Sequence, residues 1–167
     1  MPVKEAEAAN SLINSGVDVI TCHVDSPKVI VETAEKHGIM VCGYHCSQAD
    51  LAPKGYLTGA EWNWEKVYTD YVNDVKAGKP IEPRNLRGGL KEGIVKMSPY
   101  GTLVSEDAKK DADAVKAKLM DGTFVIFKGP LNDNTGKEVI PAGTSYPSGA
   151  PELDKVDYFV EGVNAEK

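Results

Sequence analysis

The chain of 167 residues is long enough for one domain of ordinary size with a substantial buried core. Its 41% hydrophobic and 26% charged residues are typical of a globular protein and argue against disorder. The net charge of -6 has the wrong sign for neutralising phosphates, so we expect no nucleic acid partner. No apolar run approaches the roughly 20 residues that span a bilayer, and MPVKEAEAAN lacks the apolar core of a signal peptide.

The chain starts with a helix signal followed by a strand signal. Apolar residues recur at helical spacing over 3–15, and Gly16 provides a C-cap, which predicts a helix there. The run VDVITCHV, 17–24, is short, rich in β-branched residues and almost continuously apolar. It predicts a parallel strand that is buried on both faces.

The same unit then repeats. Asp25, Ser26 and Pro27 have helix-start chemistry, and they predict a helix over 28–37 that Gly38 closes. The strand IMVCGY follows at once from Ile39. After a loop with Pro53 and Gly55, YLTGAEW predicts a strand over 56–62.

A long helix is predicted from Asn63, as N-cap, to about Ala77. GGLKEGIVKMSPYG then predicts a strand over 93–97, and Ser105 caps a helix that Gly122 ends. FVIFKGP predicts a further strand over 124–130.

The remainder of the chain is rich in Gly, Pro and Asn. It holds two short apolar runs, around 138–141 and 156–163. This pattern is typical of a turn-bearing excursion that ends in one more strand.

Alternating helices and strands of these lengths predict an α/β fold with an open, mostly parallel sheet and helices on both faces. Such sheets bind ligands outside the carboxyl ends of their strands. Three successive predicted strands end in polar and aromatic residues, so these residues should converge on one rim. They are Cys22, His23 and Asp25, then Gly43, Tyr44 and His45, then Glu61, Trp62 and Trp64.

A sheet of this kind normally starts with a strand, whereas this chain starts with a helix. The absent strand could come from sequence outside this chain, from its own tail or from a second copy. Because exchange of an element between protomers is a low-cost route to a dimer, a homodimer completed in this way is one hypothesis.

Cysteine and histidine at the rim raise two alternatives, a metal site and a nucleophilic enzyme. Side chains alternate in direction along a strand, so Cys22 and His23 cannot both face one ion, and buried structural cysteines are the simpler interpretation. Cys46 or Ser47 with His23 or His45 as base would suit nucleophilic catalysis, but no nucleophile elbow flanks them. The candidate metal ligands are Cys22, His23, Asp25, Cys42, His45 and Cys46.

The leading interpretation of the rim is an aromatic and polar wall for a planar ligand, with no catalysis, metal or cofactor. The alternative is that Trp62 and Trp64 are core residues at a helix start. Two residues at i and i+2 cannot both point into one core, which favours the wall for one of them. The predicted ligand-binding residues are His23, Asp25, Tyr44, His45, Glu61, Trp62 and Trp64.

Four long segments resemble the C-terminal half of the basic membrane protein family, substrate-binding lipoproteins of ABC transporters with a type I periplasmic-binding-protein fold. They are KEAEAANSLINSGVDVITCHVDSPKVIVETAEKHGI, YLTGAEWNWEKVYTDYVNDVKAGK, RGGLKEGIVKMSPYG and DGTFVIFKGPLNDNTGKEVIPAG. The resemblance implies that residues 1–130 form an α/β lobe lacking its usual first strand, and that 131–167 form a crossover and C-terminal tail. Family members have two lobes that close on a ligand, so we expect weak or no binding by a monomer of this chain.

The resemblance further implies a non-catalytic component of an importer, extracytoplasmic and membrane-anchored in the intact family, with an ABC permease as partner. Characterised relatives bind purine nucleosides or bases. The nucleoside binders carry an Asp-Ser-Asp-Gln stretch where this chain has Tyr44, His45 and Cys46, and a lysine near Trp62. A free base or another planar heterocycle is therefore the expected ligand. A self-associating structural module is a further hypothesis.

Overall fold

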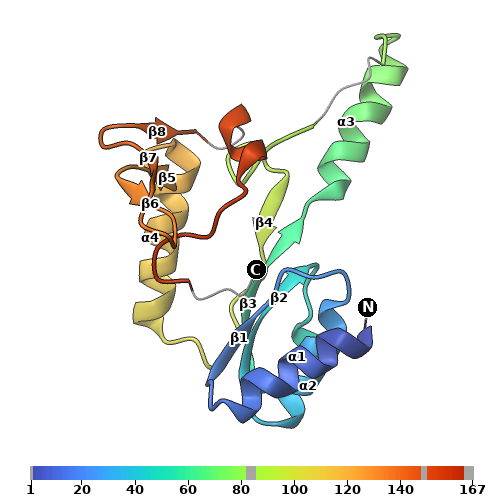
Figure 1. Ribbon diagram of the computed structural model, residues 1–167. Helices are drawn as coiled ribbons and strands as arrows, with labels where there is room; N and C mark the ends of the chain where they lie inside the picture. Colours follow the sequence, from blue (N-terminus) through green and yellow to red (C-terminus); the bar gives the residue numbers. More distant parts are fainter. Residues whose placement is uncertain (1, 82–85, 148–149, 164–167) are drawn as a thin grey trace.

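The computed structural model describes residues 2–81, 86–147 and 150–163 (Figure 1). The helices are α1 (Pro2–Asn14), α2 (Pro27–Lys36), α3 (Trp64–Lys76) and α4 (Glu106–Asp121), with short 3-10 turns η1 (Ala49–Leu51) and η2 (Pro151–Lys155). The strands are β1 (Val19–Thr21), β2 (Met40–His45), β3 (Tyr56–Trp62), β4 (Val95–Met97), β5 (Phe127–Lys128), β6 (Leu131–Asn132), β7 (Glu138–Ile140) and β8 (Ser145–Tyr146).

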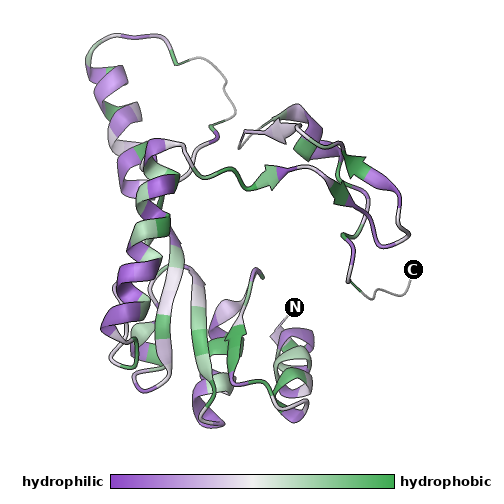
Figure 2. Ribbon diagram, turned by 90° about the vertical axis from the view of Figure 1, so that its left-hand side faces the viewer, coloured by the Kyte–Doolittle hydropathy of each residue, from purple (hydrophilic) through white to green (hydrophobic). Residues whose placement is uncertain are grey.

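The main sheet has the order β1-β2-β3-β4. The first three strands are parallel, and β4 is antiparallel to β3. In the view of Figure 2 helices stand on both sides of the sheet. The predicted α/β class with a mostly parallel sheet is confirmed, and the carboxyl ends of β2 and β3 lie side by side as expected.

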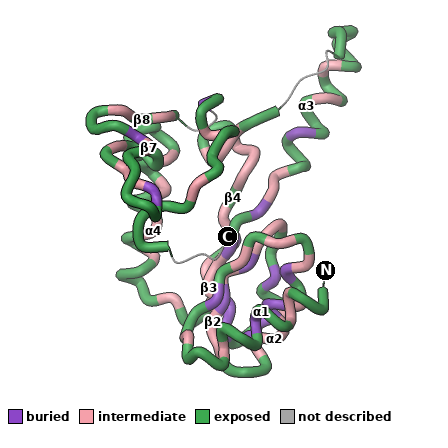
Figure 3. Tube along the Cα trace, viewed as in Figure 1, coloured by how far each residue is buried: buried purple, intermediate pink, exposed green. Residues whose placement is uncertain are grey.

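The hydrophobic core lies between the first two helices and the first three strands. Val31 and Ala34 of α2 and Val41 of β2 are completely buried, and Ala9 and Ile20 close the cluster from α1 and β1. Figure 3 shows the buried residues concentrated at this end of the molecule. The apolar face of α2 holds this helix against the sheet, because burial of apolar area contributes most to the free energy of folding.

β1 differs from the prediction for 17–24. The strand has only three residues, and of these only Ile20 is buried, whereas Val19 and Thr21 are exposed. The alternation shows that one face of β1 packs on the core and that its other face is open. A run of β-branched residues indicates a strand, but it does not reveal whether both faces are covered.

The helices α3 and α4 begin and end near the predicted residues, but only one of the two predicted N-caps forms. The Ser105 hydroxyl accepts a hydrogen bond from the Ala108 amide and so caps α4, and Gly122 ends that helix with a left-handed backbone. Asn63 precedes α3 as predicted, but its side chain does not cap the helix. Its Nδ2 donates to the Gly93 carbonyl at 2.8 Å, and therefore joins the start of α3 to the segment before β4.

The tail is less regular than its apolar runs suggest. The predicted strand 124–130 reduces to β5, which pairs with β8 instead of joining the main sheet. β6 and β7 form a second two-stranded sheet, and β7 falls in the apolar run near 138–141. The run 156–163 is not a strand; it contributes one bridge, from Val160 to Asp133. The division at residue 130 stays a prediction.

Two facing glycines let a buried tyrosine lie across the centre of the sheet. Gly43 and Gly59 are register partners in β2 and β3. A Cβ on Gly43 would meet the Tyr56 hydroxyl at 2.9 Å, and one on Gly59 would meet it at 2.6 Å. The Tyr56 hydroxyl donates to Ser98 Oγ at 2.8 Å and so connects the start of β3 with the residue after β4.

Candidate functional site

The ends of β2 and β3 place the predicted aromatic residues in one continuous row. Tyr44 stands next to the His23 ring, with the ring centroids 4.6 Å apart in an edge-to-face arrangement. Tyr44 lies 6.4 Å from Trp62, and Trp62 lies 5.9 Å from Trp64. Tyr68 extends the row along α3, with its ring stacked 6.0 Å from Trp64. These spacings are the ones at which aromatic rings attract one another.

His45 lies inside this row and fixes its geometry. Its ring centroid is 4.0 Å from that of Tyr44. The Trp62 indole nitrogen donates a hydrogen bond to His45 Nδ1 at 3.0 Å. The backbone of His45 has a φ of 75°, an uncommon conformation for a residue other than glycine. Strained residues of this kind concentrate at functional sites, so His45 is the strongest single marker of the rim.

Polar side chains adjoin the residues that carry the rings. Glu61 is the register partner of His45, is almost fully buried, and its Oε2 lies 3.4 Å from the Lys96 ammonium. Buried Gln48 accepts a hydrogen bond from the Tyr44 amide at 3.3 Å. Glu61 is therefore engaged in an ion pair and is not a freely exposed ligand contact.

Of the predicted residues, the structure brings His23, Tyr44, His45, Trp62 and Trp64 into ring contact. Glu61 is the register partner of His45 but makes no ring contact, and Asp25 is exposed in the turn before α2 without joining the row. The analysis of the sequence did not single out Tyr68, Gln48 or Lys96. Tyr68 had a readable signal, because it follows Trp64 by four residues and so shares its helix face. Gln48 and Lys96 had none, since only tertiary contacts bring them here.

A cavity of about 410 Å³ lies beside Trp62. Arg87 borders it and forms an ion pair with Asp154, Nη2 to Oδ1 2.9 Å, so the loop before β4 is held to η2. A cavity of this volume is within the range of small-molecule sites. Its lining residues are Trp62, Leu86, Arg87, Gly88, Gly89, Glu92 and Ile94.

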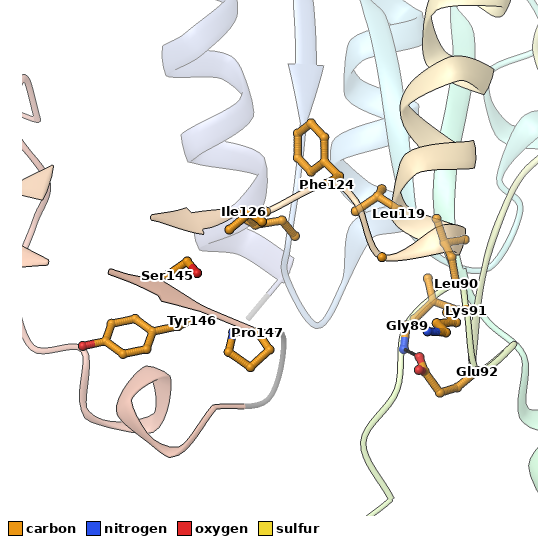
Figure 4. Close-up of a pocket in the computed structure, with 13 residues that line it drawn as sticks. Gly89, Leu90, Lys91, Glu92, Leu119, Phe124, Ile126, Ser145, Tyr146 and Pro147 are labelled. Atoms are coloured by element: carbon orange, nitrogen blue, oxygen red, sulfur yellow. Dashed lines mark hydrogen bonds between the residues drawn. The ribbon is translucent and has the colours of Figure 1, made fainter. Parts of the chain in front are cut away.

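A second cavity, of about 530 Å³, contains none of the predicted site residues. It is lined by the GGLKEG loop, the end of α4 and the β5–β8 sheet, and by Phe124 and Ile126 from the segment that joins α4 to β5 (Figure 4). Both of these side chains are exposed. The cavity offers apolar surface with few convergent polar groups, which suits protein packing better than recognition of a polar solute.

The three cysteines are free thiols. Burial raises the pKa of Cys22, and the neighbouring Cys42 raises it further. Burial also raises the pKa of Cys42 itself. Within the described parts of the chain, no group of three or more His, Cys, Asp or Glu side chains could hold a metal ion. The metal hypothesis therefore gains no support from the geometry.

These thiols give a testable order of reactivity. The thiolate is the reactive form, so a raised pKa leaves less of it at a given pH and slows alkylation. We expect iodoacetamide at about pH 8 to modify exposed Cys46 first, and Cys22 and Cys42 several-fold more slowly. Peptide mass spectrometry over time measures the three rates. Equal alkylation rates for the three cysteines in the folded protein would contradict this order. In denaturant the three rates should become similar.

The α/β fold and the row of rings at its rim are features expected of one lobe of a solute-binding protein. Comparison with known proteins agrees. The family model of PnrA-like ABC transporter substrate-binding proteins, Bmp, matches residues 2–126. The chain belongs to this family, which confirms the resemblance in its sequence.

Two curated relatives extend over almost the whole chain. A purine-binding protein of Brucella abortus is 35% identical over 98% of this chain and 45% of its own length. A putative ABC transporter glucose-binding protein of Haloferax volcanii is 26% identical over 99% of this chain and 39% of its own length. The chain thus spans less than half the length of the curated relatives that it matches.

Solved structures agree on the fold. A protein described as a transcriptional activator of the comK gene from Bacillus halodurans aligns with a TM-score of 0.64 at 22% identity, over 71% of this chain and 42% of that one. An ABC transporter solute-binding protein from Conexibacter woesei aligns with a TM-score of 0.55 at 20% identity, over 72% of this chain and 41% of that one. The predicted periplasmic-binding-protein lobe is therefore confirmed.

Every helix within residues 2–81, 86–147 and 150–163 falls short of the length and apolar character needed to cross a bilayer.

Proposed function

We propose that this chain forms one wall of the ligand-binding cleft of an ABC importer's solute-binding protein, and that this wall stacks against a purine base, a nucleoside or a similar planar heterocycle. The observation that carries the proposal is the row of rings from His23 through Tyr44 and Trp62 to Trp64 at the strand ends. Flat apolar faces with a few polar groups between them suit a planar ligand that has a polar edge.

The purine-binding relative from Brucella abortus supports a purine for this chain. The putative glucose-binding relative favours a second candidate, a sugar, whose apolar ring face can also lie on an indole. The two candidates differ in what holds the ligand. A purine would gain most from stacking on Trp62, whereas a sugar would depend more on hydrogen bonds from its hydroxyl groups.

The proposed mechanism is binding without catalysis. More than half of each curated relative lies outside the matched region, and we infer that this other part supplies the opposing wall. Closure of two lobes on the ligand by a hinge would then present a closed form to the permease. In such a protein the site lies outside the cytoplasm, anchored to the membrane.

Calorimetric titration of hypoxanthine, adenine, guanosine, adenosine and glucose into the purified chain tests the proposal. We expect a purine to bind weakly, because a single wall covers less ligand surface than the roughly 70–90% that formed pockets bury. Trp62→Ala should weaken that binding by about 1–3 kcal/mol, or roughly 5- to 150-fold, the range for stacking of a base on an aromatic side chain.

Phe159→Ala is the matched control, since Phe159 is an exposed aromatic residue of the tail that belongs to neither the row nor its cavity. Its affinity should equal that of the wild type. A purine affinity that is unchanged in Trp62→Ala would show that the ligand does not stack on Trp62. Binding of glucose but of no purine would favour the sugar. No binding by the folded chain would mean that recognition belongs to the other lobe.

The molar mass in solution, measured alongside, tests the proposed homodimer. Val19 is exposed on β1, which lies at the edge of the main sheet. An exposed strand edge is a surface on which another chain can pair. A monomer at all concentrations would exclude completion by a second copy.

A further inference from the structure

The hydrogen bond between Trp62 and His45 selects one tautomer of the neutral histidine ring. An indole N–H only donates, so His45 Nδ1, 3.0 Å from it, has to be the acceptor and carries no proton. A neutral imidazole has one proton, which is then on Nε2. His45 is therefore held as the neutral Nε2–H tautomer whenever this bond is formed.

The other ring nitrogen of His45 is available to a ligand. No hydrogen bond from the described residues reaches Nε2, and Nε2 is not among the buried polar atoms that lack a partner. It therefore faces solvent at the rim, with the Tyr44 ring 4.0 Å away from its own. Trp62 has no free donor left, since its one N–H already binds Nδ1.

We propose that His45 is the positioning and specificity-determining residue of the rim. Its Nδ1 holds the Trp62 indole in place as a stacking face, and its Nε2–H donates to an acceptor on the edge of the stacked ligand. The second half of this statement rests on the proposed function. A single donor at this position favours a ligand with an acceptor on its edge, such as O6 or N7 of a 6-oxopurine.

The arrangement makes the rim sensitive to pH. Histidine changes its charge between about pH 5 and pH 8, and a proton on Nδ1 would remove the only acceptor for the indole. The titratable groups around His45 are Tyr44 on its own strand, His23 beyond Tyr44, and Glu61 on β3 with its partner Lys96 on β4. Of these, His23 is also an imidazole in contact with Tyr44, so it needs its own variant.

Tryptophan fluorescence tests the positioning role without any ligand. In a Trp64→Phe background, Trp62 is the one remaining indole. Acidification from about pH 8 to about pH 5 should lower its emission, because an imidazolium quenches an adjacent indole and the hydrogen bond is broken. His45→Gln should abolish this response, since the Gln carbonyl accepts from the indole but does not titrate.

Two control variants show which histidine causes the pH dependence of the Trp62 emission. His37→Gln changes an exposed histidine that binds the Thr33 carbonyl at the end of α2, so the pH response should persist. His23→Gln identifies any part of the response that belongs to His23. Circular dichroism at both pH values shows that each variant is folded. A Trp62 emission that does not depend on pH, or a response that survives His45→Gln, would overturn the positioning role.

Titration of hypoxanthine at about pH 8 tests the ligand contact. His45→Phe loses both nitrogens and should weaken binding by about 5- to 10-fold, the loss expected for one or two hydrogen bonds, while His45→Gln should restore most of it. Hypoxanthine affinity unchanged in His45→Phe would overturn the donor role. If hypoxanthine does not bind the wild-type chain, the stacking function fails, and the fluorescence profile still decides whether His45 positions Trp62.

Discussion

Tyr56→Ala is expected to lower the free energy of unfolding by about 3–5 kcal/mol, the usual cost of removing a buried aromatic side chain. Tyr56 belongs to the main core cluster and is 3% exposed. Its ring covers Gly43 and Gly59, so truncation leaves a cavity that two glycines cannot fill. The Ser98 hydroxyl also loses its partner. Urea unfolding followed by circular dichroism gives the difference between variant and wild type.

Two further variants separate packing from hydrogen bonding. Tyr56→Phe keeps the ring and removes the 2.8 Å bond to Ser98, so it should cost about 1 kcal/mol. Tyr68→Ala removes an exposed tyrosine, 65% accessible on α3, and should change stability by no more than about 0.5 kcal/mol. Equal losses for Tyr56→Ala and Tyr68→Ala would show that Tyr56 is not a core residue.

Gly101→Ala is the second variant with a large expected effect, a loss of about 3 kcal/mol or more. A Cβ at this position would overlap the Tyr56 carbonyl oxygen, which is backbone and cannot move aside as a side chain can. The Gly101 amide also donates to the Leu57 carbonyl at 2.8 Å. Any shift that relieves the overlap therefore strains the contact between β3 and the segment after β4.

Gly89→Ala is the control variant. It makes the same glycine-to-alanine change at a position where a Cβ has room, so it separates steric overlap from the general effect of replacing a glycine. A Cβ there meets only Glu92 Oε2, at 3.9 Å, so we expect a change within about 0.5 kcal/mol. Thermal unfolding of both variants measures the comparison. If Gly101→Ala unfolds at the same temperature as the wild type, Gly101 does not lie as close to the Tyr56 carbonyl as described.

Both variants act on the strand that carries the aromatic wall. Thr58 donates to the Ser98 carbonyl at 3.0 Å, and the Ser98 amide donates to the Gly59 carbonyl at 2.9 Å. These bonds join the residues after β4 to the first half of β3, whose second half ends at Trp62. A loss of order at Tyr56 or Gly101 would therefore also disturb the placement of Trp62, and ligand titrations on these variants should be interpreted with that in mind.

The sequence by itself determined the helices, the parallel strands and the rim at which they end. Local signals were enough for this. Ser105 and Gly122 mark the ends of α4 by chemistry that acts within one turn, and the β-branched run 17–24 marks β1. Parallel strands place their carboxyl ends together, so Tyr44 and Trp62 could be assigned to one rim from the order of elements alone.

Only the tertiary structure decided the features that depend on contacts between distant residues. The edge position of β1, the antiparallel direction of β4 and the pairing of β5 with β8 each depend on which strand lies next to which. The bond from Trp62 to His45 needs the register between β2 and β3 and the φ of 75° at His45. No periodicity in the sequence encodes such a register, because it follows from how all the side chains pack together.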